Sequence, residues 1–393
     1  MASIDFPSDG ADRVARDKVR RHWSGTYAST RHLDPLLMLS AVVLTGFGLL
    51  MIYSATYRDL TAAGGSATAF VNKQAVALLV GLVGMGVVMI PDYRQFRAWA
   101  PVAYGFSLVL LLAVLLIGTE VNGAKAWIRL GGFQLQPVEL AKPALIAMLA
   151  ALFHERREDA LGLRALVEGL ALAAAPMLLI LGQPDFGSFM VFVAIVFGVL
   201  LLARVHVRYL VALALIGALS AFGALQLNIL KQYQVERLTA FINPDAVESR
   251  GAGFNVNQAQ IAVGSGQLTG QGFLNGSQTS LSYVPENHTD FIFTVVGEEL
   301  GFMGSVLLLS AFGLLLWRGL RIAALSRDTF GTLLAGGVVA VFAFQLFINV
   351  GMAIGIMPVT GLPLPFVSYG GTSLIAGYLM IGLLQNVNMR RFA

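Results

Sequence analysis

The sequence predicts an all-α polytopic membrane protein with about ten transmembrane helices, and three observations indicate this class. Hydrophobic residues make up 56% of the 393 residues. Charged residues make up only 12%, against roughly 25% in soluble domains. The apolar residues also gather in runs close to the ~20 residues that a helix needs to cross a bilayer.

Ten such runs predict ten spans that follow one another along the chain. Their approximate limits are 35–54, 74–90, 100–118, 137–153, 164–181, 188–203, 207–227, 289–317, 329–357 and 371–388. The two longest runs exceed one bilayer crossing, so we expect them to tilt or to extend beyond the membrane. Residues 35–393 are therefore expected to form a single membrane domain.

The basic residues indicate how these spans are oriented. With the N-terminus inside, the inner segments carry more than twice as many Lys and Arg residues as the outer segments. Lys and Arg are enriched in cytoplasmic loops, so both termini are predicted to be cytoplasmic. The net charge of +4 follows the same rule and does not indicate nucleic acid as a partner.

The first 34 residues are polar, mixed in charge and without an apolar pattern, which predicts a disordered cytoplasmic tail. The first apolar run comes too late and is too long for a cleavable signal peptide. A second long polar segment, at about 228–288, is predicted to be a large extracytoplasmic loop between helices 7 and 8. Its stretch NVNQAQIAVGSGQL has regularly spaced apolar residues, so we expect this loop to be ordered.

Charged side chains in or beside the spans are candidates for function, because each costs roughly 2.5–3.5 kcal/mol at a helix centre. Glu139 and Lys142 lie three residues apart in QPVELAKPA, on one helix face, where they can pair. The pair either holds helices together or positions an outer cavity in which the lysine attracts an anion. Both interpretations stay open.

Asp185 in GQPDFG and Asp290 in ENHTDF are predicted to lie at the outer interface. Asp185 occupies a short turn, where capping is an alternative role. Asp290 follows His288 and Thr289 and can cap the next span. It also suits a general base, because its reference pKa of ~3.9 leaves it ionised and partial burial raises its basicity.

Further acids and bases accompany these two aspartates. Glu286 precedes Asp290, while Glu298 and Glu299 lie about two turns deeper, where structural hydrogen bonds are expected. Lys125 and Arg129 flank Trp127 at interface depth. They either anchor the chain at the interface or clamp a phosphate.

The stretch GLPLPFVSYGGTS (361–373) has too much Gly and Pro for a helix, so it is expected to be buried in protein or to line a cavity. Several kinds of site are not predicted. The absence of cysteine excludes disulfides and thiol chemistry. The five histidines lack ligand spacing, and no nucleotide-binding glycine motif indicates an organic cofactor.

Taken together, these motifs resemble the SEDS family (shape, elongation, division and sporulation), and most closely its RodA branch. The resemblance rests on NGAKAWIRLGGFQLQPVELAK, GQPDFGS, AFINPDAVESRGAGFNVNQAQIAVGSGQLTGQGFLNGSQTSLSYVPENHTDFIFTVVGEELGFMG and GLPLPFVSYGGTS. It covers about residue 35 to the C-terminus. The stretch GSQTSLSYVPE is more similar to elongation-type than to division-type members.

The resemblance implies a multi-pass enzyme of the bacterial cytoplasmic membrane that polymerises lipid II on the extracytoplasmic side during cell elongation. It implies a class B penicillin-binding transpeptidase as partner and Asp290 as the catalytic residue. It also implies Glu139 and Lys142 as the buried pair, and Asp185 as the aspartate of the QPD motif. In its first outer motif the family commonly has Arg where this chain has Ala126, so Lys125 or Arg129 is expected to replace it.

The expected chemistry is an inverting glycosyl transfer. Asp290 takes the proton of the acceptor 4-hydroxyl, and undecaprenyl diphosphate leaves with help from a basic residue or a divalent cation such as Mg²⁺ or Mn²⁺, which a carboxylate such as Asp290 can hold. Two other classes remain: a lipid-precursor transporter (flippase), and a non-enzymatic scaffold for cell-wall proteins. Unusual residues gather on the predicted outer side, which disfavours the transporter.

Overall fold

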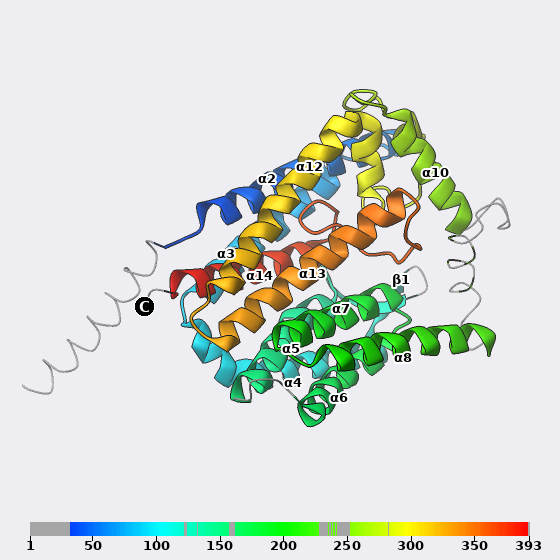
Figure 1. Ribbon diagram of the computed structural model, residues 1–393. Coiled ribbons are helices and arrows are strands. Elements are labelled where there is room, and N and C mark those ends of the chain that lie inside the picture. The colour runs from blue at the N-terminus through cyan, green and yellow to red at the C-terminus, as the bar shows by residue number, and fades with distance from the viewer. Residues whose placement is uncertain are drawn as a thin grey trace, which may run out of the picture.

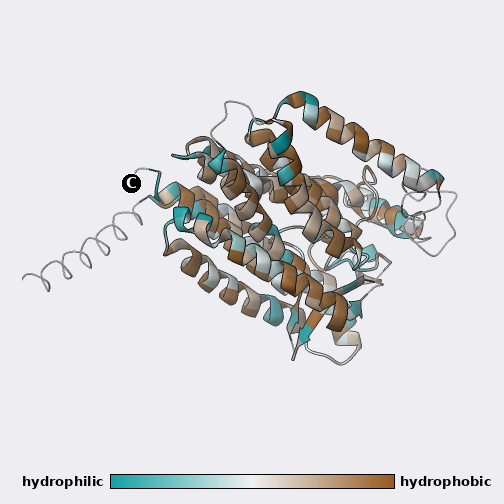
Figure 2. Ribbon diagram, turned by 90° about the horizontal axis from the view of Figure 1, so that it is seen from below, coloured by the Kyte–Doolittle hydropathy of each residue, from teal (hydrophilic) through white to brown (hydrophobic). Residues whose placement is uncertain are grey.

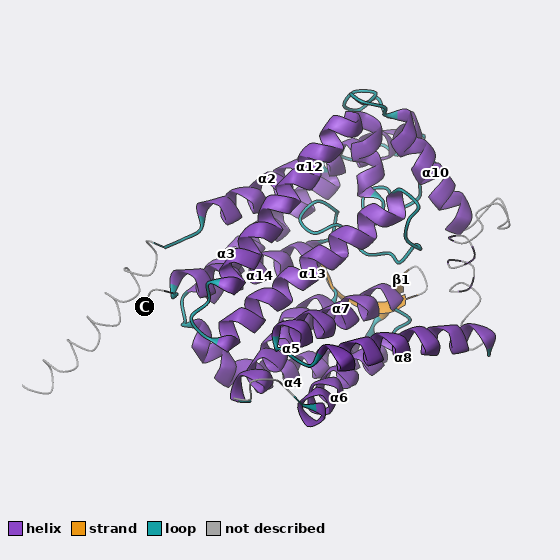
Figure 3. Cartoon of the chain, in the orientation of Figure 1, coloured by secondary structure: helices purple, strands orange, loops and turns teal. Residues whose placement is uncertain are grey.

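The computed structural model describes residues 32–121, 124–131, 133–156, 162–227, 252–281 and 283–391, together with 235, 237, 239 and 241. Helices running side by side form the bulk of the molecule (Figures 1 and 3). The C-terminus lies at one end, called here the C-terminal end, and β1 and α10 lie at the other, called here the loop end (Figure 1). The predicted N-terminal tail and much of 228–251 lie outside the described residues.

Each of the ten predicted runs falls on a helix. The helices are α2 (Pro35–Ala62), α3 (Ala69–Met89), α4 (Tyr93–Ile117), α5 (Pro137–Glu155), α6 (Leu163–Leu181), α7 (Phe186–Leu202), α8 (Val207–Gln226), α12 (Ile292–Ala324), α13 (Thr329–Ala353) and α14 (Gly371–Met389). Within the described residues, seven are long and apolar enough to cross a membrane, and α7 and α8 carry shorter apolar stretches. Hydrophobic residues cover most of their length (Figure 2). The polytopic fold is confirmed, and the number of crossings stays a prediction.

Aspartate side chains explain where several of these helices begin. The carboxylates of Asp34, Asp92, Asp185 and Asp328 each accept a hydrogen bond from a backbone N–H in the first turn of α2, α4, α7 and α13. Such caps satisfy donors that otherwise lack a partner inside the helix. The helices also extend past the apolar runs, because their polar ends continue the same backbone bonding: α2 continues to Ala62 and α4 starts at Tyr93.

The structure also contains a small antiparallel sheet at the loop end, which the all-α prediction does not include. It contains β1 (Thr119–Val121), β2 (Ala124–Leu130) and β3 (Phe133–Leu135), in the order β1-β2-β3. Trp127 pairs with Thr119, and Arg129 pairs with Gln134. Alternation along β2 places Lys125, Trp127 and Arg129 on one face and the buried Ala126 on the other.

Part of the predicted outer loop, 252–281 and 283–288, lies within the described residues, and the prediction that the whole loop is ordered is not tested. It contains α10 (Ala252–Ser265) and the single turn α11 (Ser277–Ser280). The buried face of α10 is formed by Val256, Ala259 and Ala262, whereas Ile261 is exposed. Small residues at this face allow α10 to pack closely against the first turns of α12.

The long helix α12 is broken at Gly301, whose φ of 63° and ψ of −157° are not helical. The chain at 267–272 replaces the interrupted backbone bonds, so the break lies against protein instead of in open space. The replacing bonds are Gln271 N to Glu298 O (3.0 Å), Gly272 N to Glu299 O (3.0 Å), Phe302 N to Gln267 O (2.8 Å) and Met303 N to Leu268 O (3.1 Å).

The Gly- and Pro-rich stretch is irregular up to residue 370 and buried, as predicted, and α14 then begins at Gly371. Gln74 of α3 holds it with both ends of its side-chain amide. Its nitrogen donates to Ser368 O (3.1 Å), and its oxygen accepts from Gly370 N (3.1 Å). Gly48 of α2 lets the stretch approach closely, since a Cβ there would lie 2.6 Å from Val367 Cα.

Candidate active site

A tight turn just before α12 holds Asp290 at the loop end. Glu286 adopts a positive φ of 53°, and its carbonyl accepts hydrogen bonds from the backbone N–H groups of Thr289, Asp290 and Phe291. The Thr289 hydroxyl lies 3.0 Å from a Glu286 carboxylate oxygen and donates to it. The predicted residues 286–290 therefore form one compact unit.

The irregular segment 354–370 lies against this turn. The side-chain nitrogen of Asn349, on α13, donates to the carbonyls of Asp290 (2.7 Å) and Leu362 (2.8 Å). Gly361 has a φ of 76°, and a Cβ there would lie 3.3 Å from Asp290 Oδ2. Glycine at 361 thus allows the backbone to lie directly beside the carboxylate.

Asp290 is half-buried, and the described residues donate no hydrogen bond to its carboxylate. Burial is the main reason that the pKa of Asp290 rises to about 7, and the negative charges of Glu286 and Asp185 raise it further. Arg237 opposes them. The expectation that burial makes this aspartate more basic is met in this geometry.

Aromatic rings form one wall of the site. His288 packs against Phe70 and Tyr369, with ring centroids 5.0 and 5.8 Å away, and its carbonyl accepts from Tyr369 N (2.9 Å). Burial lowers the pKa of His288, while Glu286 and Asp59 counteract this effect. A neutral His288 therefore serves as packing surface for the turn.

Asp185 joins three helix N-termini near Asp290. One carboxylate oxygen caps α7 through Ser188 N (2.9 Å), and the other accepts from Ser188 Oγ (2.7 Å) and Gln136 Nε2 (3.4 Å). Gln136, just before α5, donates its backbone N–H to Thr372 Oγ1 of α14 (3.2 Å). Asp185 has the alternative capping role and also lies within electrostatic range of Asp290.

Glu139 and Lys142 pair as their spacing predicts, with 2.5 Å between Oε1 and Nζ. Both are buried, and Lys142 has no exposed surface. In this arrangement the ammonium contacts Glu139 inside the bundle and has no access to solvent. The bond lies within α5, so it neutralises two buried charges without joining two helices, and the choice between the two interpretations stays open.

Lys125 and Arg129 have different surroundings although they share a strand face. Lys125 Nζ donates to the carbonyls of Leu115 (2.9 Å) and Leu116 (3.2 Å) and so caps the C-terminus of α4. Arg129 is exposed. Of the two predicted clamp residues, Arg129 is thus the one whose charge is available to an anion.

Glu298 and Glu299 make structural hydrogen bonds, as expected. The buried Glu298 carboxylate accepts from Gln278 N (2.6 Å), Thr279 N (2.9 Å), Thr279 Oγ1 (2.6 Å) and Ser277 Oγ (3.3 Å) and so holds α11. Glu299 accepts from Ser54 Oγ of α2 (2.5 Å). Neither carboxylate faces the site.

Three residues around the Asp290 turn and the irregular segment are not predicted from the sequence: Arg237, Asn349 and Gln74. Arg237 is one of several basic residues of the predicted outer segments, and the two amides lie inside apolar runs. A polar amide within a predicted span was a usable signal, because burying it requires hydrogen-bond partners. Among the described residues, no group of three His, Asp or Glu side chains is arranged to hold a metal ion.

A sequence model of the FtsW/RodA/SpoVE family, described as "Cell cycle protein", matches residues 35–392. The chain belongs to this family. It is 39% identical to a protein named probable peptidoglycan glycosyltransferase FtsW, from Geobacter sp. strain M18, over 91% of this chain and 97% of that protein. It is 37% identical to stage V sporulation protein E of Bacillus subtilis, over 90% and 96% of the two chains. It is 35% identical to peptidoglycan glycosyltransferase MrdB of Escherichia coli K12, over 93% and 96%.

Solved structures give the same family fold. A chain from a peptidoglycan synthase complex that coordinates polymerisation and crosslinking matches with a TM-score of 0.77 and 32% identity, covering 92% of this chain and 98% of that one. The rod shape determining protein RodA of Thermus thermophilus matches with a TM-score of 0.68 and 30% identity, over 92% and 98%. The predicted family and its polytopic membrane architecture are confirmed.

Proposed function

We propose that this FtsW/RodA/SpoVE family member is a peptidoglycan glycosyltransferase that polymerises lipid II into β-1,4-linked glycan strands at the outer face of the cytoplasmic membrane. The observation that carries the proposal is the half-buried Asp290, whose pKa of about 7 suits a general base at neutral pH. The names of the relatives support the reaction class.

In this reaction Asp290 removes the proton of the acceptor sugar 4-hydroxyl while that oxygen attacks the anomeric carbon of the donor. The new bond joins O4 to C1, the bond from C1 to the phosphate oxygen breaks, and undecaprenyl diphosphate leaves with the electron pair. An α-linked donor and a β-linked product require one inversion, so one base suffices. A retained α linkage in the product would contradict this scheme.

The leaving diphosphate needs positive charge near the base. The exposed Arg129 on β2 and Arg237, which acts electrostatically on Asp290, are the residues we assign to this role. Lys125 would contribute only after leaving the carbonyls of α4. Donor and acceptor both carry lipid tails, which must lie along the helices.

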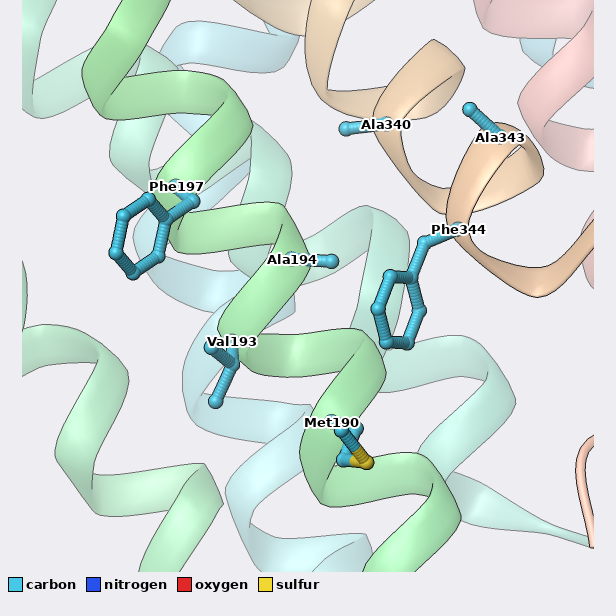
Figure 4. Close-up of a pocket in the computed structure, with 7 residues that line it drawn as sticks. All are labelled: Met190, Val193, Ala194, Phe197, Ala340, Ala343 and Phe344. Carbon is cyan, nitrogen blue, oxygen red and sulfur yellow. The ribbon is translucent and has the colours of Figure 1, made fainter. Parts of the chain in front are cut away.

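An apolar groove between α7 and α13 suits such a tail. It has a volume of about 510 Å³ and is lined by apolar side chains only (Figure 4). Met190, at one end of it, is the fifth residue after Asp185. The lining residues are Met190, Val193, Ala194, Phe197, Ala340, Ala343 and Phe344.

A divalent cation, Mg²⁺ or Mn²⁺, remains part of the proposal. Asp290 and Glu286 lie on one turn and offer carboxylate oxygens, which these ions prefer, and Mg²⁺ commonly binds through one or two carboxylates together with substrate phosphates. A bound ion would neutralise charge on the leaving diphosphate.

The partner we propose is a class B penicillin-binding transpeptidase, in keeping with the crosslinking complex that contains the structural relative. We retain elongation as the biological role and division as its alternative. Identities of 39%, 37% and 35% to relatives named FtsW, stage V sporulation protein E and MrdB do not separate the two. A growth test in strains lacking either the elongation or the division enzyme distinguishes them.

The deciding experiment measures glycan strands formed from labelled lipid II by the purified protein with its cognate transpeptidase, with and without Mg²⁺ or Mn²⁺. Polymer from the wild type and none from Asp290→Ala supports the proposal. Asp328→Ala is the matched control, because it removes a carboxylate at the C-terminal end. Equal polymer from Asp290→Ala would refute the base, and no polymer from an intact wild-type complex would favour transport or scaffolding.

A further inference from the structure

Asn349 is a buried amide that the proposed chemistry does not use. It has no exposed surface and lies near the end of α13. Its side-chain nitrogen donates to two backbone carbonyls, that of Asp290 (2.7 Å) and that of Leu362 (2.8 Å). Because both partners are acceptors, the orientation of the amide is fixed, with the nitrogen toward the turn and the irregular segment.

Two unpaired polar atoms accompany these bonds. The buried oxygen of Asn349 and the buried side-chain nitrogen of Gln345, one turn earlier on α13, have no hydrogen-bond partner among the described residues. A buried amide that leaves one of its polar atoms unpaired is costly. The two bonds that Asn349 does make, at the point where α13 meets the Asp290 turn, offset part of this cost.

Asn349 also connects parts of the molecule that are far apart in the sequence. Asp290 is 59 residues and Leu362 is 13 residues from it. Leu362 directly follows Gly361, the residue that lies beside the Asp290 carboxylate. The amide therefore fixes the distance between the backbone of the reacting aspartate and the segment that covers its side chain.

We propose that Asn349 is the positioning residue of the glycosyl transfer, joining the Asp290 and Leu362 carbonyls so that the Asp290 carboxylate is held half-buried against Gly361. This inference rests on the proposed function for its role in catalysis. The positional part stands on the hydrogen bonds alone and is measured without turnover.

The charged groups around Asp290 define what a displacement would change. Glu286 faces it from its own turn, Asp185 from the start of α7, and Arg237 from the described residues of 235–241. The segment 361–370 contributes no charged side chain. Loosening the Asp290 turn would move its carboxylate relative to these charges and to Gly361.

The test compares Asn349→Leu with two matched amide variants. Gln345→Leu removes the amide on the same helix whose nitrogen has no partner among the described residues, and Gln385→Leu removes a buried amide that makes two hydrogen bonds to the Asp34 backbone at the C-terminal end. Asn349→Ser, which keeps one donor, replaces Asn349→Leu if the latter does not fold. The protein is studied in complex with its transpeptidase.

The first readout is hydrogen–deuterium exchange of the backbone amides of residues 289–291, which donate to the Glu286 carbonyl in the Asp290 turn. We expect exchange at these amides to become at least about tenfold faster in the Asn349 variant and to stay unchanged in both glutamine variants. The second readout is lipid II polymerisation, in which kcat should fall by about tenfold or more, while KM for lipid II changes little.

Each outcome decides a separate question. Unchanged exchange of the 289–291 amides in folded Asn349→Leu, or equally faster exchange in Gln385→Leu, overturns the positioning role. Faster exchange with unchanged kcat also overturns it, because the position would then not matter for turnover. A wild type that makes no polymer counts against the glycosyltransferase function, while the exchange measurement still tests the link between Asn349 and the Asp290 turn.

Discussion

The carboxylates at the two ends of the bundle have neighbours of opposite charge. At the C-terminal end, each of three aspartates pairs with an arginine: Asp34 with Arg318, Asp92 with Arg390 (3.8 Å) and Asp328 with Arg94 (3.7 Å). At the loop end, Glu286 and Asp185 act on Asp290 as like charges, with Arg237 as the opposing cation. The paired aspartates join helices, whereas burial, helped by these two acids, raises the pKa of Asp290 far enough for proton transfer near neutral pH.

Replacing one aspartate at each end by asparagine is expected to give the largest effects. Asp290→Asn should lower polymerisation by ~10²–10⁴-fold with little loss of stability, because it removes a base but no structural bond. Asp34→Asn should instead cost about 3–5 kcal/mol of unfolding free energy, because it leaves the partly buried Arg318 unpaired. Polymer yield per folded molecule and thermal unfolding in detergent separate the two. Similar profiles for both variants would remove the contrast between the ends.

The Glu139–Lys142 pair lies at the loop end, in the first turns of α5, but it is paired like the aspartates of the C-terminal end. It therefore tests whether a paired charge stabilises the fold at either end of the bundle. Lys142→Met should destabilise the protein by about 3–5 kcal/mol, because it leaves a buried carboxylate without a partner. Adding Glu139→Gln should recover much of the loss. An unchanged free energy of unfolding in Lys142→Met would show that the pair does not stabilise the fold.

The pH dependence of polymerisation tests how much the neighbouring acids raise the pKa of Asp290. Activity should rise with pH through a midpoint near 7, as Asp290 loses its proton, and Glu286→Gln should move this midpoint to lower pH by removing a neighbouring negative charge. Because the folded pKa is raised above the unfolded value, the contribution of Asp290 to stability is present at low pH and lost as pH rises toward 7. Initial rates from pH 5 to 9 provide the measurement, and an unmoved midpoint in Glu286→Gln would contradict the coupling.

The smallest effect is expected from the exposed Arg129 on β2. Arg129→Gln should raise the KM for lipid II or lower kcat by roughly three- to tenfold, since an exposed charge interacts weakly with an anion in water. Lys125→Gln should mainly lower stability, because Lys125 caps α4. Rates at several lipid II concentrations distinguish the two, and reversed profiles would reassign the clamp.

Sequence reasoning succeeded where a local pattern determines the structure. The apolar runs located ten helices, the spacing of three predicted the Glu139–Lys142 pair, and the Gly and Pro content identified a buried irregular segment. It did not foresee the strands at 119–135 or the cap that Lys125 provides. Those features depend on which backbone carbonyl lies nearby, and this is decided by tertiary packing.

The same limit explains the partial view of the site. The Asp290 turn was recognised as a contiguous motif, so its members were named correctly as neighbours. Asn349 and Gln74 act across 59 and about 300 residues of chain, respectively, and no periodicity connects them to their partners. The role of Asp290 as the base, and those of its neighbours, stay predictions until the variants are measured.

The break at Gly301 has a mechanical consequence. Both sides of the break are bonded to the same short chain. The carbonyls of Glu298 and Glu299 accept from Gln271 and Gly272, and the N–H groups of Phe302 and Met303 donate to Gln267 and Leu268. The two halves of α12 are therefore tied together at one point, and any change in the angle between them must also move the 267–272 chain. Glycine is required at that point, because a Cβ on Gly301 would lie 2.4 Å from Gly270 N.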